Sequence, residues 1–393
     1  MHVLKQISAI TRMNLRSVPL RPGSSSVVVV GIAGVVGVLV SVLAMVTGLA
    51  QIMTSSGRPD RAIVMGTGSS FEILSNLSRD ATQTILDAPG IRRDADAKPV
   101  ASSEALAIVR TILKDGNSAN IPLRGVGPAI FALRPELRIV EGRTFEPAVR
   151  ELIVGRSAQR QFRGMDLGSR IMLRGAEWTV VGVFESQGDQ HEAEMLTGVE
   201  TLQSAFRRNA FQSVTVQLDS AVAFPEFEAS LTNNPSLSVD VLRESDYYKQ
   251  QSRAFTQVLA AVAYLVSGIM ALGAALGALN SMYTAVSGRA VEIATLRVLG
   301  FGPAPIAISV FAEALLLAVT GGVLGAFLAW LLFNGHVVST SGAGISQLAV
   351  PLAVGPRIMA LGILWACVIG MLGASLPAIL AARAPLAAAL RGN

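Results

Sequence analysis

Four stretches of the sequence are long and apolar enough to cross a membrane as helices, and they constrain the fold more than any other feature. A bilayer core of roughly 30 Å needs about 20 consecutive apolar residues of helix. One stretch lies near the N-terminus, a long polar region follows it, and three more stretches fill the last third of the chain. The sequence therefore predicts a membrane protein with four transmembrane α-helices and a large α+β extracytoplasmic domain between helices 1 and 2.

Composition supports this division, because apolar residues make up 51% of the chain and charged residues only 15%. The charged residues are concentrated between positions 58 and 253. The segments predicted from these patterns are an interfacial helix at 1–24, spans at 25–53, 255–283, 305–333 and 357–380, an outer domain at 54–254, a coupling segment at 284–304, a loop at 334–356 and a tail at 381–393.

The first 22 residues are basic and contain no acid. On a helical projection, Ile7, Ile10 and Leu15 share one face and Arg12 lies opposite, which is the pattern of a helix lying in the membrane interface. A cleaved signal peptide is the alternative. The apolar run that follows is too long for one and no small-residue cleavage site follows it, so we expect a retained anchor.

Basic residues in the short flanks indicate which side of the membrane each segment faces. The loop at 334–356 contains no Lys or Arg. Because positive flanks stay in the cytoplasm, we expect both termini and the 284–304 segment to be cytoplasmic, the outer domain to be periplasmic, and the protein to lie in a bacterial inner membrane. The basic residues that support this are Lys5, Arg12, Arg16, Arg21, Arg289, Arg297, Arg383 and Arg391.

The polar region alternates short strand-like runs with short helical patterns, separated by Gly, Pro and Asn. This predicts a mixed sheet in one or two lobes, with a hairpin at 174–177. A polar stretch at 243–253 is expected to continue the second membrane helix outward. The predicted strands are 62–65, 151–154, 170–173, 178–184 and 213–218, and the predicted helices are 80–87, 157–162, 198–206 and 225–231.

The segment between the second and third spans carries charges at Arg289, Glu292 and Arg297, with apolar residues between them. A short amphipathic helix at a membrane face suits a partner protein better than a substrate, although an ordinary interfacial helix would show the same pattern. The segment ends at a breaking sequence that includes Gly300. The residues expected to make the partner contact or to support it are Arg289, Glu292, Ile293, Leu296, Arg297 and Gly300.

Glu313 is the one acidic residue within a predicted span. At ~1.5 Å per residue it lies about 12 Å beyond Pro305, inside the hydrocarbon region. Such residues are functional candidates because their burial is costly. The favoured alternative is that Glu313 is paired, for example with Arg297, and serves packing. Further along the same span, Gly321, Gly322 and Gly325 allow close helix packing, with a hinge as the less favoured interpretation.

Several kinds of chemistry have no support in the sequence. The phosphate-binding pattern G-x-x-x-x-G-K-[ST] is absent, as are G-x-S-x-G and H-E-x-x-H. The acidic and histidine residues at 189–194 lack metal-ligand spacing and are interpreted as a solvated loop, so no metal site is predicted. The single cysteine cannot form an intramolecular disulfide, and no dense basic patch suggests nucleic-acid binding.

The pattern R-x-x-E-I-A-x-L-R-x-L-G at 289–300, then F-x-E-A-L-L-L at 311–317 with Glu313 in it and glycines at 321, 322 and 325, resembles the signature of the FtsX-like, MacB-type permeases of ABC transporters. The Leu-Pro-Ala and Ala-Ala-Arg motifs near the C-terminus resemble the closing motif of the same family. Glycine placement over 125–183 is loosely similar to the outer domain of MacB-like permeases.

The resemblance implies a permease that couples ATP hydrolysis by a separate cytosolic ABC ATPase dimer to movement of the periplasmic domain. No cofactor would be bound directly, and ATP and Mg would be on the partner ATPase. A second permease copy or paralogue and a periplasmic adaptor protein are implied partners, besides the lipid membrane. Export of a hydrophobic or peptide-like substrate is favoured. The alternatives are a lipoprotein-releasing permease of the LolC and LolE type, and an FtsX-like protein that activates a cell-wall hydrolase.

Overall fold

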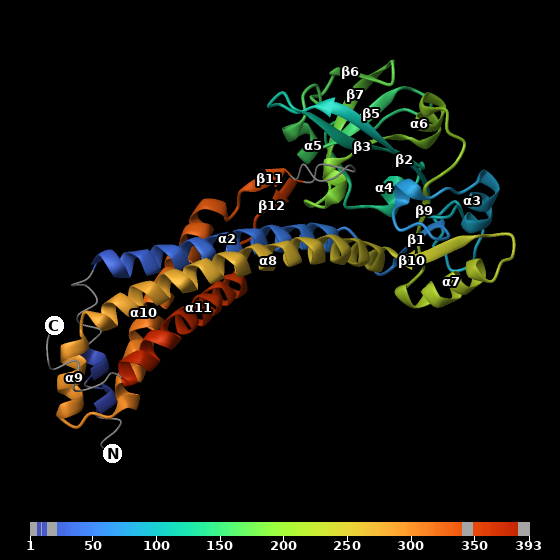
Figure 1. Cartoon of the computed structure of the whole chain (residues 1–393). Helices are drawn as coiled ribbons and strands as arrows, with labels where there is room; N and C mark the ends of the chain where they lie inside the picture. The colour runs from blue at the N-terminus through green and yellow to red at the C-terminus, as the bar shows by residue number, and fades with distance from the viewer. Residues whose placement is uncertain (1–5, 9, 14–21, 340–348, 384–393) are drawn as a thin grey trace. The chain divides into compact units, whose positions relative to one another are not determined.

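The computed structural model describes residues 6–8, 10–13, 22–339 and 349–383. The chain divides into two compact units. The first contains residues 1–48, 257–336 and 351–393, and the second contains residues 49–256 and 337–350. The first is a helical unit and the second is built on a sheet (Figure 1).

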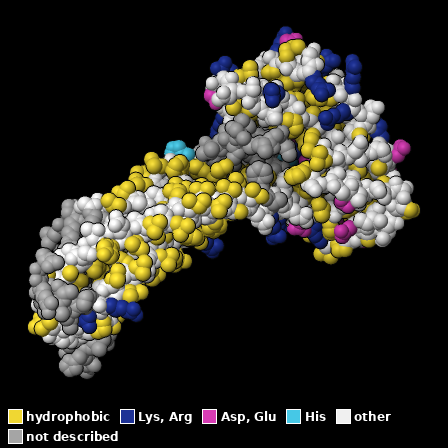
Figure 2. All heavy atoms as spheres, viewed as in Figure 1, with side chains coloured by type: hydrophobic (Ala, Val, Ile, Leu, Met, Phe, Trp, Pro, Cys, Tyr) yellow, Lys and Arg dark blue, Asp and Glu magenta, His cyan; other side chains and the backbone are white. Residues whose placement is uncertain are grey.

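Among the described residues, four helices are long and apolar enough to cross a membrane by length and composition. Figure 2 shows hydrophobic side chains along the outside of the helical unit, as expected for a surface in contact with lipid. This confirms the predicted fold class of four membrane helices with a mixed α/β domain between the first and second. The helices are α2 (Pro22–Ser55), α8 (Glu244–Ser287), α10 (Pro303–Phe333) and α11 (Pro356–Arg383).

Helix α8 is much longer than a membrane span, with 44 residues. Its first ten residues are the polar stretch that the sequence predicted as a continuation of the second span. No Gly or Pro occurs between Glu244 and Ser267, so nothing in the local sequence interrupts the helix. Between α8 and α10 lies the short helix α9 (Ala290–Val298). The loop after α10 contains the short strands β11 (Val337–Ser339) and β12 (Ala349–Pro351).

The membrane helices pack through glycines where their backbones approach most closely. A Cβ atom on Gly325 would lie 2.3 Å from the carbonyl oxygen of Ala33 in α2, and one on Gly321 would lie 2.8 Å from that of Val29. On the other side of α10, a Cβ atom on Gly322 would lie 2.7 Å from Ala366 of α11. The three glycines singled out in the sequence therefore lie at two different helix contacts, as small residues do in membrane bundles.

The second unit contains one mixed sheet of ten strands, in the order β10-β1-β9-β2-β3-β8-β5-β7-β4, with β6 paired to β7. All five predicted strands are present, and the sequence missed the others. The strands are β1 (Arg61–Gly66), β2 (Ala101–Ile112), β3 (Ser118–Val126), β4 (Arg138–Gly142), β5 (Glu151–Gly155), β6 (Arg170–Leu173), β7 (Ala176–Glu185), β8 (Met195–Gly198), β9 (Ser213–Gln217) and β10 (Val239–Arg243).

Strand β2 joins the two halves of this sheet. Its residues 101–104 pair with β9, and its residues 105–112 pair with β3. Strands β3 and β8 are parallel, as are β5 and β7. The predicted hairpin is confirmed between β6 and β7, with Leu173 opposite Ala176. Its turn is formed by Arg174 and Gly175, which both have positive φ (50° and 77°), as a type I′ turn requires.

Short helices cover the sheet and complete its core. The largest fully buried side chain is Trp178 on β7, which packs in an apolar cluster with Leu152, Phe162 and Leu202. All four predicted helices of this unit are present. The helices and 3₁₀ turns are η2 (Glu72–Leu74), α3 (Arg79–Leu86), α4 (Ile130–Leu133), α5 (Arg156–Gln161), η3 (Gln190–Ala193), α6 (Val199–Phe206), η4 (Ala221–Ala223) and α7 (Phe224–Thr232).

Candidate functional site: the α9 segment

The sequence between α8 and α10 folds as a helix with a defined stop at each end. After Val298 the N–H of Gly300 donates to the carbonyl of Arg297 (3.1 Å), and the N–H of Phe301 donates to that of Leu296 (3.1 Å). Together they form a Schellman motif, which needs a residue with positive φ directly after the C-cap. Gly300 provides it, with φ at 91°. Gly300 therefore fixes the end of α9.

Arg289 occupies the N-cap position of α9 and its side chain is directed into the helical unit. It is only 6% exposed, and its Nη1 lies 3.4 Å from Oε2 of Glu313 in α10, which is also 6% exposed. The partner of Glu313 in this contact is Arg289, where the sequence suggested Arg297. Arg297 lies at the other end of α9 and donates to the carbonyl of Ala382 at the end of α11 (3.3 Å). Both arginines thus tie α9 to neighbouring helices.

The two faces of α9 differ in exposure. Ile293 and Ala294 are buried, and Ile293 packs in a cluster with Met282 of α8 and Ile306 of α10. Leu296 and Arg297 are half-buried, whereas Glu292 is exposed. Its apolar neighbours Val291, Val298 and Leu299 are 58%, 62% and 70% exposed. Of the three charged residues predicted to contact a partner, Glu292 is the one that the helix leaves on its open face.

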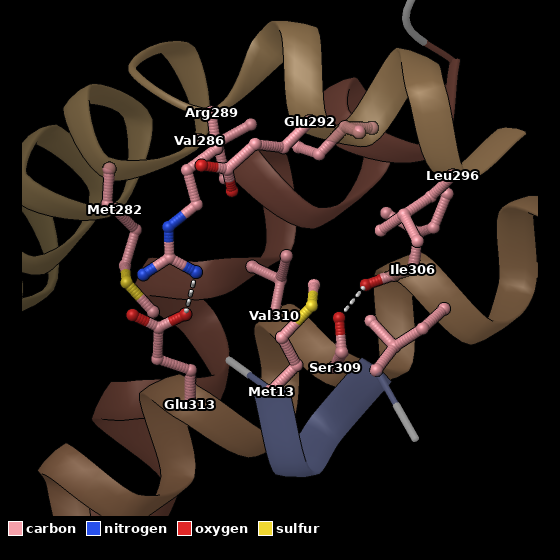
Figure 3. A pocket seen from close by; sticks show the side chains of 13 residues that line it. Met13, Met282, Val286, Arg289, Glu292, Leu296, Ile306, Ser309, Val310 and Glu313 are labelled. Atoms are coloured by element: carbon pink, nitrogen blue, oxygen red, sulfur yellow. Dashed lines mark hydrogen bonds and ion pairs between the residues drawn. The ribbon is translucent and has the colours of Figure 1, made fainter. Parts of the chain in front are cut away.

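A cavity of about 20 Å³ lies beneath α9 (Figure 3). This is room for about one water molecule and not for a substrate. Figure 3 shows Arg289 and Glu313 facing each other on one side of it and Ser309 on the other, where Ser309 Oγ donates to the carbonyl of Ile306 (2.7 Å). The cavity therefore lies where α8, α9 and α10 pack against one another.

The N-terminal segment also lines this cavity. Residues 6–8 and 10–13 are helical. Ile10 is 3% exposed and packs with Met282, Ile293 and Ile306, and Met13 lies at the cavity wall (Figure 3). Part of the apolar face predicted to lie on lipid is therefore covered by protein. Residues 14–21 of the predicted helix, which include Arg16 and Arg21, lie outside the described residues, and positions 22–24 belong to α2.

A cluster of buried charges in the sheet unit was not predicted from the sequence. Arg124 on β3 is 3% exposed. Its guanidinium contacts Glu104 of β2 (2.7 Å), Glu194 next to β8 (2.7 Å) and Glu72 of η2 (3.0 Å). Although burial opposes ionisation, the charge and hydrogen bonds of Arg124 lower the pKa of Glu72 and Glu194, and these carboxylates raise the pKa of Arg124. The cluster joins strands from both halves of the sheet.

The acidic segment at 189–194, interpreted from the sequence as a solvated loop, is buried, so that prediction was wrong. His191 is 1% exposed and its Nδ1 lies 3.4 Å from Oε2 of Glu194. Burial raises the pKa of Asp189, which accepts a hydrogen bond from Ser186 Oγ (2.7 Å). The segment is also held by contacts with residues far away in the sequence, such as Ser56 and Arg124, which a local pattern does not reveal. Among the described residues, no group of three or more His, Cys, Asp or Glu side chains could hold a metal ion.

The sheet unit also has an open polar groove of about 770 Å³. Its lining contains two arginines, three glutamates and the hydroxyl side chains of Thr179, Thr201 and Ser204. Such a surface suits a polar chain better than an apolar molecule. The groove is lined by residues 148–151 and by Arg170, Glu177, Thr179, Glu200, Thr201, Ser204 and Ala205.

Two family models match this chain. The MacB-like periplasmic core domain matches residues 25–234, which is more than half of the chain, and the FtsX-like permease C-terminal domain matches residues 264–386. The second match contains α9 and the Arg289–Glu313 pair. No ATP-binding domain is indicated by these matches.

Similar curated proteins include the macrolide export ATP-binding/permease protein MacB of Bdellovibrio bacteriovorus, 24% identical over 327 residues, with 76% of this chain and 49% of that protein covered. The protein of the same name from Acinetobacter baylyi is 24% identical over 341 residues, with 77% and 50% covered. The chain thus spans about half the length of the curated relatives it matches.

Similar solved structures include the periplasmic region of MacB from Actinobacillus actinomycetemcomitans, with 16% identity, a TM-score of 0.36, and 49% of this chain and 92% of that chain covered. The extracellular domain of the noncanonic ABC-type transporter YknZ from Gram-positive bacteria has 16% identity and a TM-score of 0.37, with 46% and 99% covered.

Proposed function

The chain belongs to the FtsX-like, MacB-type family of ABC transporter permeases, and from this premise we propose that it couples ATP hydrolysis by a cytosolic ABC ATPase to movement of its outer domain. ATP and Mg would be bound outside these 393 residues, because the sequence contains no G-x-x-x-x-G-K-[ST] motif. The α9 segment would face the cytoplasm, in a bacterial inner membrane, in agreement with the basic flanks. It would receive the movement of the ATPase.

The observation that carries this proposal is the construction of α9. One face is fixed to α8, α10 and α11 through Ile293, Arg289 and Arg297, and the opposite face exposes an acid among apolar side chains. A helix that is anchored on one side and open on the other can transfer displacement to the spans. We therefore assign the ATPase contact to the face of Val291, Glu292, Val298 and Leu299. Arg289, Ile293, Leu296, Arg297 and Gly300 would position that face.

A charge reversal on the open face tests the proposed contact. In affinity purification from native membranes, wild-type chain should recover an ABC ATPase, and Glu292→Arg should lower the recovered amount about tenfold, the factor that corresponds to 1.4 kcal/mol. Glu226→Arg on α7 makes the same charge change at an exposed helical position of the sheet unit and should recover as much ATPase as wild type. Recovering no ABC ATPase with the wild-type chain would contradict the proposal.

A combined alanine change at Arg289, Glu292 and Arg297 should also lower ATPase association, but it is a less specific test. Arg289 is buried in an ion pair and Arg297 is bonded to the end of α11. Their loss would disturb the fold of the helical unit as well as the contact. Glu292→Arg changes an exposed residue that also lines the cavity beneath α9 but that, within the described part of the chain, has no hydrogen bond or ion pair to another helix, so it disturbs the helical unit less.

For the transported substrate we propose export of a peptide-like or hydrophobic molecule by mechanotransmission. The relatives named for macrolide export support an export role over lipoprotein release or activation of a cell-wall hydrolase. The polar groove of the sheet unit favours a peptide-like substrate or the tip of a periplasmic adaptor protein, because both arginines and glutamates line it. A second permease copy or paralogue would complete the transporter, since most of α8 presents apolar side chains to its surroundings.

Cross-linking distinguishes these roles. Photoreactive side chains introduced at Ser204 in the groove should cross-link a periplasmic adaptor or a peptide in cells. The same group at Leu272, which is 67% exposed on α8, should cross-link a second permease chain. If neither position gives a protein or peptide adduct, the proposed periplasmic partners and the paired permease are wrong.

A further inference from the structure

The first residue of α8 is a fully buried acid. Glu244 is 0% exposed, its Oε1 lies 2.6 Å from Nη2 of Arg134, and its Oε2 lies 3.5 Å from Nη1 of Arg61. The same Oε2 accepts the backbone N–H of Arg58 (3.0 Å). The Glu244 carboxylate thus contacts two arginine side chains and one backbone N–H group.

The groups around Glu244 come from different parts of the sheet unit. Arg61 is the first residue of β1 and is itself bound by Glu136, and Arg134 directly follows α4. Arg58 lies on the chain that has just left α2. Glu244 therefore joins the sheet, the end of one long helix and the start of another.

Backbone packing at the same place is equally close. A Cβ atom on Gly57 would lie 2.7 Å from the carbonyl oxygen of Glu244, so only glycine fits there. The N–H of Ser245 donates to the carbonyl of Arg58 (3.4 Å). One turn further, Tyr247 and Tyr248 pack against Ile63 and Met65 of β1. The start of α8 is in this way fitted to the chain leaving α2 and to the sheet.

Apolar packing alone would hold the start of α8 without fixing its direction, because the hydrophobic effect is not directional. A buried carboxylate between two arginines has few allowed geometries, and such an arrangement adds little net stability relative to apolar side chains. What such an ion pair contributes is a fixed relative orientation of the groups that it joins. We propose that Glu244 is a positioning residue that locks the first turn of α8 and the chain leaving α2 to the outer sheet, so that the three move as one body.

This inference deepens the proposed function, since movement arriving along α8 would reach the sheet through Glu244. Its test uses the chain alone and does not need the ATPase. In the full-length chain in lipid nanodiscs, Glu244→Gln should raise amide hydrogen exchange at residues 56–61 and 244–250 about tenfold, the factor expected for loss of a hydrogen bond to a charged group. Exchange in β2 and β9 should stay at the wild-type level.

Glu104→Gln is the matched control, because Glu104 is also a buried acid on an arginine but its ion-pair partner, Arg124, lies within the sheet. It should raise exchange in β2 and β3 and leave 56–61 and 244–250 unchanged. If Glu244→Gln does not fold, Arg134→Lys keeps the charge and should raise exchange at the same two segments. An unchanged exchange rate in these two segments would overturn the inference. An even rise across the whole sheet would also overturn it, because it would show a purely stabilising role. Failure to recover an ATPase would count against the proposed function only.

Discussion

At the scale of single residues, the Arg289–Glu313 ion pair leads to a specific prediction about the free energy of unfolding. Removing one member of a buried ion pair leaves the other charge without compensation and costs about 3–5 kcal/mol, whereas replacing both costs much less. Arg289→Met should therefore lower the free energy of unfolding by about that amount, and the double variant with Glu313→Gln should recover part of it. A double-mutant cycle from reversible unfolding in detergent measures the coupling. Additive effects of the two changes would show that the pair does not interact.

The same pair bears on whether Glu313 has a role in transport. Glu313→Gln keeps the size of the side chain and removes its charge. If Glu313 serves packing, the variant should be less stable but should transport at the wild-type rate once folded. Loss of transport at normal membrane levels of the folded protein would assign it a functional role.

A second residue-scale prediction concerns acid stability. Burial disfavours the ionised form of Glu136, but the hydrogen bond and charge of Arg61 outweigh this effect and lower the pKa to about 2 from 4.5. Since the folded-state pKa is below the unfolded one, the stabilisation is fully present above about pH 4.5 and is lost as the pH falls toward 2. Unfolding measured across this window should show a shallower loss of stability for Glu136→Gln than for wild type. Parallel curves would contradict the assignment.

At the scale of elements, the contact between α2 and α10 depends on Gly325. Adding a methyl group there would place it 2.3 Å from a backbone oxygen that cannot move aside. Overpacking of this kind costs about 1–3 kcal/mol, so Gly325→Ala should lower the melting temperature in detergent. Gly273→Ala in α8 is the control, because nothing lies within 4 Å of its Cβ position, and it should be neutral or slightly stabilising. Equal effects of the two changes would argue against close α2–α10 packing.

At the scale of the whole molecule, the proposal requires α9 and the sheet unit to face opposite sides of the membrane. In a Cys367→Ser background, Val222→Cys, which is 85% exposed in the sheet unit, should react with a membrane-impermeant maleimide in intact spheroplasts. Glu292→Cys should react only after permeabilisation. Labelling of position 292 in intact spheroplasts would refute the proposed orientation and, with it, coupling to a cytosolic ATPase.

Most elements of the fold could be predicted because their signals are local. The four membrane helices follow from hydropathy summed over neighbouring residues, and the hairpin at 174–177 follows from two strand-like runs joined by a short segment that contains Gly175. Strands such as β2 and β3 were missed because their exposed and buried residues do not alternate: both faces are largely buried. A strand covered on both sides loses the period of two that identifies it.

The sequence by itself determined that the chain has four membrane-spanning helices, a polar domain after the first, and a short charged helix that ends just before Gly300. Tertiary structure decided which charges meet. Arg124 pairs with three glutamates that lie 20, 52 and 70 residues away in the sequence. Glu244 accepts a hydrogen bond from the backbone N–H of Arg58, which is 186 residues away. Tertiary structure also directs the Arg289 side chain toward Glu313 and buries the segment at 189–194. A helix signal is a sum over neighbours in the chain, whereas the partner of a buried charge is set by which strands and helices come together, and no local pattern encodes that.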